Sequence, residues 1–461
     1  MRQMALSCAL ALCLSSLAIN RAAAVIRYTG VNLAGAEFGS TPTPGNLGTY
    51  GSAYIYPNSS EVDYYLGKGL NTFRLPFRWE RMQPTQAGPL STAELARMDA
   101  FVNYATAQGG TVIVEPHNFQ RYYPDPNNFQ QSAQGLVGTA VPNSAYADFW
   151  SKMADHYKDN GRVIFNLMNE PTTLPTEQLV TSTNAAIAAI RATGATNTIH
   201  VPGNAYTGAH SWTQNWYGTA NSVAMLNVVD PAKNMVYEVH QYFDNDSSGT
   251  STQIGTNANL NNTNIGVERI TAFTNWLRTN HKKGFLGEFA LANARFGEPD
   301  GTGSTAKIAD ETLQATLNYM QANADVWEGW AWWGGGPWWG NYMFRLDPTA
   351  LPNPTPAQEQ PAMAYLVPYV AGNPVELPGD FNLDDVVNGD DLLLFNMSNG
   401  RSGLDLAADA DDDGSIDGAD ILAWQQTLGQ TTPAIPVGGA VPEPSAALLM
   451  LAALPLLRRL L

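Results

Sequence analysis

The chain is poor in cysteine. Of its 461 residues only Cys8 and Cys13 are cysteines, and both lie in the first 24 residues. A disulfide framework and cysteine-based metal sites are therefore excluded from the remaining chain. Its stability must come from core burial, with bound ions as the other available source.

Basic residues are also scarce. There are 24 Lys and Arg against 41 Asp and Glu, for a net charge of −17. No basic patch suited to nucleic acid is present, which excludes that class of partner. The acidity is uneven, because residues 378–428 contain 12 Asp, no Glu and one Arg. That short segment carries most of the net charge.

Long apolar runs are absent apart from the two ends. Residues 1–24 have Arg2 at the start, an apolar stretch over 4–19 and three alanines at 22–24. This order is typical of a cleavable export signal, and the stretch is short for a membrane span. A lipid anchor on Cys13 is disfavoured because Leu12 is large where such sites have a small residue. We therefore predict a signal peptide over 1–24.

Aromatic residues are abundant. The chain has 44% hydrophobic and 10% aromatic residues, including 12 Trp and 19 Tyr. Such a content allows a large core, and it also allows flat platforms on which ligand rings stack. Trp212, Trp216, Trp338 and Trp339 are candidate platforms, and each is as well explained by the core.

Strand-like and helix-like runs alternate along the chain. The expected strands are 28–33, 71–76, 110–117, 163–170, 198–203, 235–242, 284–289 and 327–333. Amphipathic runs at 91–108, 144–160, 177–192, 267–282 and 305–324 are the expected helices. Eight mostly apolar strands alternating with helices predict an α/β fold of the (β/α)8 TIM barrel type.

Polar residues recur where these strands end. They are Arg74, His117, Asn169, Glu170, His240, Tyr242 and Glu288, with Trp333 beside them. In (β/α)8 barrels the carboxyl ends of the strands form the catalytic face. One polar residue at a strand end is commonly a cap, whereas a set of this size on one face predicts a functional site.

Glu170 and Glu288 each follow a short apolar run. A buried carboxylate is costly unless it is paired or used, and two facing carboxylates can cleave a glycosidic bond. One of them must stay protonated near neutral pH, whereas Arg74 would keep Glu288 ionised by proximity. Asn169 is placed to hold a sugar 2-hydroxyl, and His240 and Tyr242 to orient the second carboxylate.

The segment after the predicted barrel contains a repeat. We expect the barrel over 25–370, a linker over 371–377 and the repeat over 378–428. Oxygen-bearing residues occupy positions 1, 3, 5, 9 and 12 of two loops, a spacing that matches calcium loops of the EF-hand type. The predicted calcium ligands are Asp380, Asn382, Asp384, Asn388, Asp391, Asp409, Asp411, Asp413, Asp417 and Asp420. Because the first loop lacks glycine at position 6, we expect it to bind calcium more weakly.

The C-terminal tail has its own organisation. A linker over 429–440 precedes Val441-Pro442-Glu443-Pro444, a short apolar stretch and Arg458-Arg459. The stretch is marginal for a bilayer span. We predict a sorting segment over 441–461 that is removed during export, so that contact with the membrane is transient.

Several motifs together resemble glycoside hydrolase family 5, in particular its endo-β-1,4-glucanases. They are Thr72-Phe73-Arg74-Leu75-Pro76, Pro116-His117-Asn118, Met168-Asn169-Glu170-Pro171, His240-Gln241-Tyr242, Gly287-Glu288-Phe289 and Trp333-Gly334. The runs Gly30-Val31-Asn32-Leu33-Ala34-Gly35 and Pro202-Gly203-Asn204 resemble the fungal-type branch. The resemblance covers residues 28–370. It implies a monomeric retaining enzyme that acts on β-glucan without a cofactor, with Glu170 as acid/base and Glu288 as nucleophile. It implies Arg74, His117, Asn169, His240, Tyr242 and Trp333 as the residues around the substrate.

The repeat resembles a dockerin type I module, which implies bound calcium and a cohesin-type protein partner. Gly389-Asp390 and Gly418-Ala419 differ from the Ser/Thr pairs of well-studied dockerin surfaces, so the fold and calcium carry over better than the partner. The tail resembles a PEP-CTERM sorting signal, which implies a bacterial protein that is secreted or held at the cell surface.

Two alternatives stay open. In the first, the chain is an enzyme of the same family whose substrate is another β-glycan, such as mannan, xyloglucan or mixed-linkage glucan. Membership of a family determines the reaction mechanism more closely than the substrate. Outside it, the chain is a non-catalytic carbohydrate-binding or scaffold-attached protein. The second alternative requires a lost carboxylate, and both glutamates are present.

Overall fold

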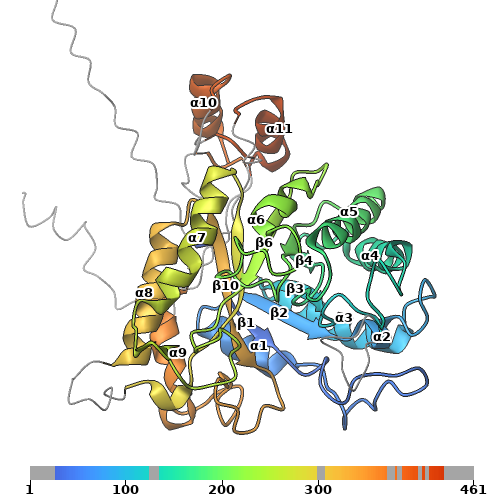
Figure 1. Cartoon of the computed structure of the whole chain (residues 1–461). Coiled ribbons are helices and arrows are strands. Elements are labelled where there is room, and N and C mark those ends of the chain that lie inside the picture. The colour runs from blue at the N-terminus through green and yellow to red at the C-terminus, as the bar shows by residue number, and fades with distance from the viewer. Residues whose placement is uncertain are drawn as a thin grey trace, which may run out of the picture.

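Strands and helices alternate around a central barrel (Figure 1). The structure is a computed structural model that describes residues 26–123, 134–297, 307–370, 379–381, 387–402, 408–410 and 415–429. The predicted signal peptide and sorting segment, with Cys8 and Cys13, lie outside these residues. Among the described helices, none combines the length and apolar character that a membrane crossing requires.

Eight parallel strands close the barrel. Their order around it is β1-β10-β9-β6-β5-β4-β3-β2, and β1 pairs with both β2 and β10. The strands are β1 Tyr28–Leu33, β2 Thr72–Phe77, β3 Thr111–Pro116, β4 Val163–Asn166, β5 Ile199–Pro202, β6 Met235–His240, β9 Gly284–Phe289 and β10 Trp327–Gly335. The predicted (β/α)8 barrel is confirmed. A small hairpin, β7 Gly255–Thr256 and β8 Asn259–Leu260, which the sequence reasoning missed, follows β6.

Helices surround the barrel between successive strands (Figure 1). The longer ones are α1 Ser59–Gly67, α3 Thr92–Ala107, α4 Asn143–Tyr157, α5 Thr176–Ala192, α7 Ile265–Thr279 and α8 Ile308–Ala322. Shorter ones are α2 Trp79–Met82, α6 Asn221–Ala224, α9 Pro361–Leu366 and the 3-10 turns η1 Met225–Asn227, η2 Asn293–Arg295, η3 Pro356–Gln358 and η4 Val367–Tyr369. Helix α1 was not predicted, although Asn58 and Glu61 form a capping box at its start.

Side chains alternate between the two sides of each strand, as the strand period requires. On each strand, the side chains that point outward pack against the helices and belong to the main core. The other set fills the barrel, where Tyr28, Ile113, Ile164, Val236, Phe285 and Ala331 form a separate buried cluster. Polar residues of the same strands lie above this cluster, which positions them beneath the mouth of the barrel.

Two short helices follow the barrel. They are α10 Gly389–Ser398 and α11 Gly418–Thr427, shown in red in Figure 1. Phe381, Phe395, Ala408 and Ile416 form their small core. The segment just after α10 pairs with the one just before α11 through an antiparallel bridge between Ser402 and Ser415. The two halves of the sequence repeat therefore pack on each other.

Candidate active site

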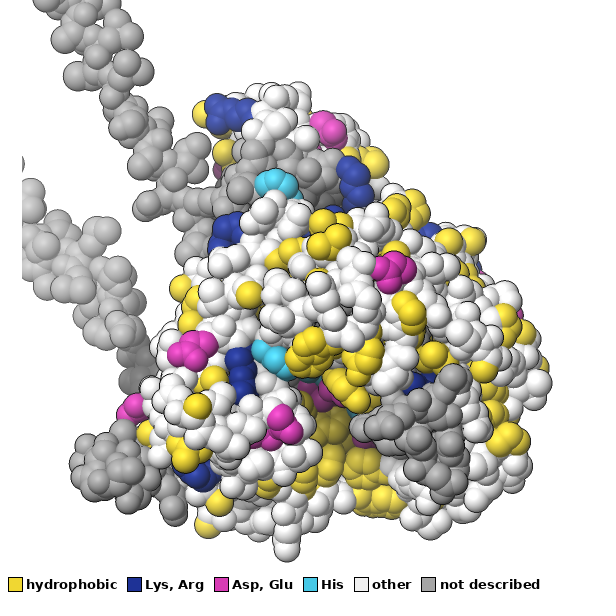
Figure 2. All heavy atoms as spheres, in the orientation of Figure 1, with side chains coloured by type: hydrophobic (Ala, Val, Ile, Leu, Met, Phe, Trp, Pro, Cys, Tyr) yellow, Lys and Arg dark blue, Asp and Glu magenta, His cyan; other side chains and the backbone are white. Residues whose placement is uncertain are grey.

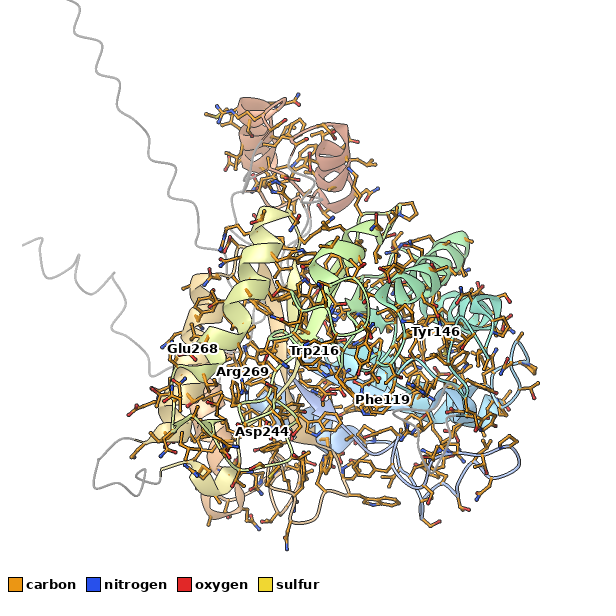
Figure 3. The ribbon with its side chains drawn as sticks, in the orientation of Figure 1. Phe119, Tyr146, Trp216, Asp244, Glu268 and Arg269 are labelled. Atoms are coloured by element: carbon orange, nitrogen blue, oxygen red, sulfur yellow. The ribbon has the colours of Figure 1, made fainter. Side chains whose placement is uncertain are left out.

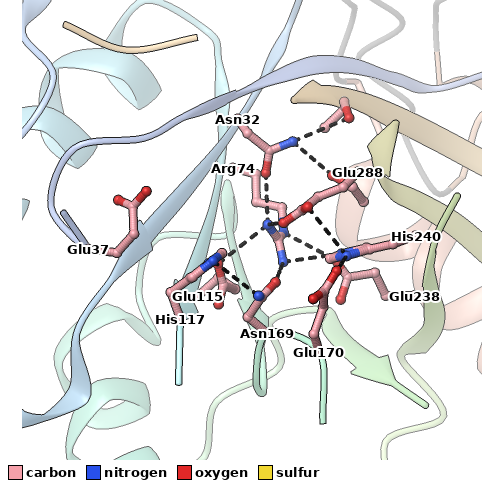
Figure 4. A network of polar contacts seen from close by, with 12 residues as sticks. Asn32, Glu37, Arg74, Glu115, His117, Asn169, Glu170, Glu238, His240 and Glu288 are labelled. Atoms are coloured by element: carbon pink, nitrogen blue, oxygen red, sulfur yellow. Dashed lines mark hydrogen bonds and ion pairs between the residues drawn. The ribbon is translucent and has the colours of Figure 1, made fainter. Parts of the chain in front are cut away.

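The predicted site residues converge at the carboxyl ends of the barrel strands. Figure 2 shows a hollow on this face, in which acidic side chains lie among hydrophobic ones. Figure 4 shows the polar network formed there by side chains from β1, β2, β3, β6 and β9 and from the loop after β4. Sequence positions far apart along the chain thus meet in one place.

Glu288, near the end of β9, is almost fully buried, with 4% exposure. Its Oε1 accepts a hydrogen bond from Arg74 Nη1 at 2.8 Å, and its Oε2 accepts one from Tyr242 Oη at 2.9 Å. Both oxygens are thereby fixed in direction. Arg74 and Tyr242, which the sequence predicts as neighbours of Glu288, thus each hold one oxygen of the carboxylate.

Arg74 is the centre of the network. Its Nη1 also donates to Asn32 Oδ1 at 2.8 Å, and its Nη2 donates to Asn169 Oδ1 at 2.9 Å. Its guanidinium forms ion pairs with Glu115 at 3.4 Å and, through Nε, with Glu238 at 3.0 Å. The Nε contact is an ion pair without hydrogen-bond alignment, since Nε finds no hydrogen-bond acceptor. One buried cation thus faces three carboxylates.

Glu170 lies four residues beyond the end of β4, not on the strand, where the predicted strand over 163–170 was too long. Its backbone has φ 41°, a left-handed conformation that is uncommon outside glycine. This turn directs the side chain back toward the barrel axis, where Oε1 lies 2.8 Å from His240 Nδ1. Backbone strain of this kind is concentrated at functional sites.

Glu170, His240 and Glu288 lie close together. One oxygen of each carboxylate and one ring nitrogen of His240 are all within 4.8 Å of one another. Such a trio can hold a metal ion, but here Arg74 already supplies a cation to Glu288 at 2.8 Å. The spacing is close to the roughly 5–5.5 Å between carboxyl groups that is typical of retaining glycosidases.

The charges of the network follow from burial and neighbours. Burial raises the pKa of Glu288, and His240 and Arg74 oppose this effect only in part. Arg74 therefore acts in the predicted direction, but desolvation is the larger influence. Burial alone would lower the pKa of His240, yet Glu288, Glu170 and Glu238 together raise it to about 10. His240 is therefore an imidazolium at neutral pH.

The remaining predicted residues, Asn169, His117 and Trp333, lie next to one another. Asn169 Nδ2 lies 3.1 Å from His117 Nε2, and the ring of Trp333 stacks on His117 with centroids 5.7 Å apart. Burial lowers the pKa of His117 well below its usual value, so the ring is neutral. A flat, uncharged surface thus lies next to the carboxylates.

Sequence reasoning missed three members of the network: Asn32, Glu115 and Glu238. Asn32 Nδ2 donates to the carbonyl of Gly287 at 2.8 Å and so ties β1 to β9. Glu115 and Glu238 each precede a predicted site histidine by two residues. Because side chains two apart on a strand share a face, this spacing was the signal that could have found them.

A loop after β6 supports Tyr242. Asp244 accepts hydrogen bonds from the backbone amides of Gly249, Thr250 and Ser251 at 3.1–3.2 Å. Arg269 of α7 donates to the carbonyls of Tyr242 and Asp244 at 2.6 and 2.7 Å; Figure 3 labels Asp244 and Arg269. The loop, residues 244–251, is therefore held against the helix.

The four candidate tryptophan platforms separate into two kinds. Trp212 is fully buried against Phe273 and Trp276 and is core. Trp216 and Trp338 are 53% and 38% exposed, and Trp339 packs edge-on against Trp333. Trp339 also stacks on Tyr342, so Trp216, labelled in Figure 3, and Trp338 are the two candidates that stay exposed.

Of the predicted calcium ligands, Asn382, Asp384, Asp411 and Asp413 lie outside the described residues. Asn388 and Asp417 are the N-caps of α10 and α11, and Asp391 and Asp420 complete their capping boxes. Asp380 and Asp409 lie near the starts of the two halves. Positions 9 and 12 of both loops thus have the same arrangement, as the repeat predicts.

Comparisons with known proteins point to a family whose members cleave glycosidic bonds, as the pair of carboxylates also suggests. Residues 31–336 match the family model described as cellulase, glycosyl hydrolase family 5. Endo-β-1,4-glucanase A of Emericella nidulans is 38% identical over 325 residues, which are 70% of this chain and 87% of the relative.

Two solved structures extend the comparison. XacCel5A in complex with cellopentaose is 40% identical, with 75% of this chain and 99% of that chain covered and a TM-score of 0.65. Pseudomonas stutzeri endoglucanase Cel5A in complex with cellobiose is 28% identical, with 77% and 97% covered and a TM-score of 0.62. The chain belongs to the cellulase family, glycosyl hydrolase family 5.

Proposed function

We propose that the protein is a retaining endo-β-1,4-glucanase that hydrolyses internal bonds of cellulose or related β-glucans. The observation that supports this function most directly is the pair of carboxylates, Glu170 and Glu288. One oxygen of Glu170 lies within 4.8 Å of one oxygen of Glu288. That separation suits attack by one carboxylate and is shorter than the roughly 6.5–9.5 Å between the carboxyl groups of inverting enzymes. Relatives named endo-β-1,4-glucanases, and a related structure with bound cellopentaose, support the substrate class.

Glu288 is the nucleophile in this proposal. Tyr242 and Arg74 hold its two oxygens in fixed directions, so that one lone pair faces the anomeric carbon. Arg74 and the imidazolium of His240 stabilise its charge against the cost of burial. Attack forms a glycosyl-enzyme ester and breaks the glycosidic bond.

Glu170 is the acid/base. It donates its proton to the leaving oxygen, then removes a proton from the water that hydrolyses the ester. With its side chain 19% exposed, it is the more accessible of the two carboxylates. Asn169, held by Arg74 and His117, is placed for the sugar 2-hydroxyl, and Trp333 for the sugar face. No step requires a metal or an organic cofactor.

Carboxymethylcellulose hydrolysis tests the assignment. Glu288→Gln and Glu170→Gln keep the shape of each side chain, and we expect each to lower kcat by about three or more orders of magnitude. Equal reducing-sugar release by wild type and Glu288→Gln would sink the nucleophile assignment. A panel of β-glucan, mannan, xyloglucan and xylan with product sizing separates the endoglucanase from its alternatives, and a wholly inactive wild type favours a carbohydrate-binding protein.

We propose further that residues 378–428 form a dockerin-like module that binds two calcium ions and a cohesin-type partner. The duplicated capping geometry of Asn388 and Asp417 supports it, together with the Asp-rich spacing. Exposed Leu393 and Leu422 occupy the same position in the two halves and are candidates for the partner surface. Pull-down with a cohesin, with and without chelator, tests the partner.

The remaining division of the chain is also a proposal. We assign residues 1–24 to a signal peptide, 25–370 to the catalytic barrel, 371–377 and 429–440 to linkers and 441–461 to a sorting segment. The apolar run and small residues before position 25 and the Pro-Glu-Pro tail support secretion or retention at the cell surface. Mass spectrometry of the exported protein would locate both cleavage sites, and intact ends would contradict it.

A further inference from the structure

Glu238 holds two cations side by side. Its Oε1 lies 3.0 Å from Arg74 Nε and 3.4 Å from His240 Nε2, while Arg74 Nη2 and His240 Nε2 are themselves 3.4 Å apart. With His240 protonated, the last contact joins two positive charges. An interposed carboxylate is what makes such a contact tolerable in a buried site. Burial alone would raise the pKa of Glu238, but Arg74 and His240 lower it to about 2.

The backbone of β9 makes room for this carboxylate. A Cβ atom at Gly287 would lie 2.0 Å from Glu238 Oε1, so no side chain fits there. Gly287 directly precedes Glu288. The place of Glu238 is therefore built into the strand that carries the proposed nucleophile.

The second oxygen of Glu238 finds no hydrogen-bond partner among the described residues. The same holds for Glu115 Oε1, for both side-chain polar atoms of Asn166 and for both ring nitrogens of His200. All four side chains are fully buried, and they come from the neighbouring strands β3, β4, β5 and β6. Asn166 and His200 are directly paired in register.

In folded proteins, most buried polar atoms form a hydrogen bond, either with another protein group or with an ordered water. A neutral His200, whose pKa burial lowers to about 4, offers one donor and one acceptor. Asn166 offers both kinds, whereas an ionised Glu238 only accepts. The set is complementary to water, which donates two hydrogen bonds and accepts two.

We propose that Glu238 is a positioning residue for Arg74 and His240, and that water enclosed with Asn166 and His200 beneath the carboxylate pair binds its second oxygen. The proposal rests on the proposed glucanase function for its kinetic consequence. Glu238 is fully buried, so it acts through Arg74 and His240. It raises the pKa of His240 next to Glu170 and keeps Arg74 aimed at Glu288, so the charge of one buried side chain reaches both carboxylates of the pair.

Its removal has a definite electrostatic signature. The charged and titratable groups around Glu238 are Arg74, His240, His200 and Glu115, and His240 in turn faces Glu288 and Glu170. Loss of one negative charge favours deprotonation of every group in the set. Both limbs of the pH profile of kcat/KM should therefore move toward lower pH.

The experiment compares Glu238→Gln, Glu238→Asp and Glu94→Gln in the full chain. We expect Glu238→Gln to shift both limbs down by about half a unit or more and to lower kcat at least about tenfold. Glu238→Asp keeps the charge and should restore the limbs to their wild-type positions. Glu94 is a buried, ion-paired carboxylate of α3, away from the site, and serves as the matched control with unmoved limbs. A loss of kcat in Glu238→Gln with unmoved limbs overturns the positioning role.

Two readouts do not depend on glucanase activity. The His240 imidazole resonance should titrate at lower pH in Glu238→Gln than in wild type, and an unchanged titration contradicts the proposal. A crystal structure should contain water within hydrogen-bond distance of Glu238 Oε2 and of Asn166 or His200, and dry contact between these side chains removes the water site. If wild type hydrolyses no β-glycan, the proposed function fails while these two results still decide the inference.

Discussion

Arg74 Nη1 and Glu288 Oε1 are joined by a 2.8 Å charge-assisted hydrogen bond between two side chains that are almost fully buried. The same guanidinium holds Asn169 through Nη2. Because a guanidinium is a rigid planar fork, one side chain fixes the position of Asn169, on the loop after β4, relative to Glu288 on β9.

Arg74→Lys should show how much of this depends on shape. Lysine keeps the charge but offers no fork, so Asn169 and Glu288 cannot both be held. We expect kcat to fall at least about 100-fold and stability to fall by about 1–3 kcal/mol, the usual cost of leaving a buried acceptor unsatisfied. Urea denaturation and initial rates measure the two effects. Wild-type rates in this variant would mean that charge alone suffices.

Tyr242→Phe should move the acidic limb of the pH profile upward. The hydroxyl donates to Glu288 Oε2 at 2.9 Å and so stabilises the ionised form. Without it the pKa of Glu288, already raised by burial, rises further, and a higher pH is needed to ionise the proposed nucleophile. Initial rates from pH 4 to 9 measure the limb. The alkaline limb serves as an internal control.

Gly249→Ala should impair catalysis through Tyr242. Gly249 has φ +70°, and a Cβ there would lie 2.6 Å from the Tyr242 ring. The backbone conformation costs about 1 kcal/mol for alanine, and the ring must shift as well. We expect a lower kcat with a small loss of melting temperature. Gly51→Ala, at φ +80° with open space around it, is the matched control and should leave kcat unchanged.

The pH dependence of stability should reveal His240. Its pKa rises from an ordinary value of 6.5 to about 10 in the folded protein. Folding therefore gains stability from its proton below about pH 6.5, and this gain is lost as the pH rises through about 10. The free energy of unfolding should fall more steeply between pH 7 and 10 in wild type than in His240→Asn. Parallel curves would show that His240 is neutral in the folded state.

Calcium should stabilise the C-terminal helices and leave the barrel indifferent. Asp380→Ala combined with Asp409→Ala removes the first ligand of each predicted loop, and with it the calcium-dependent rise in melting temperature. Calorimetry with and without chelator measures the rise. Hydrolysis rates should change little in the double variant. A melting curve that ignores chelator in wild type would remove the calcium assignment.

The sequence predicted the barrel and most of the site because apolar strands carry a strong signal and their polar ends stand out. It extended the fourth strand to Glu170, which in the structure lies on a loop, because the left-handed turn at Glu170 is a feature of the packed loop and not of the local pattern. Glu115 and Glu238 do not stand out in the sequence, because each lies two residues before the polar residue at the strand end. They lie deeper in the barrel than the strand ends, where polar residues are more easily recognised. Trp212 and Trp216 could not be told apart, since only tertiary packing decides which ring is covered.

The Arg74 hub also bears on how the molecule assembles. Its partners lie 42 residues away at Asn32, 95 at Asn169 and 214 at Glu288. Contacts of such long range form only after most of the loop entropy has been lost. We therefore expect the Arg74 hub to form late in folding, when β9 and β10 close against β1. Substitutions within it should chiefly accelerate unfolding, while the early half of the barrel sets the rate at which the chain folds.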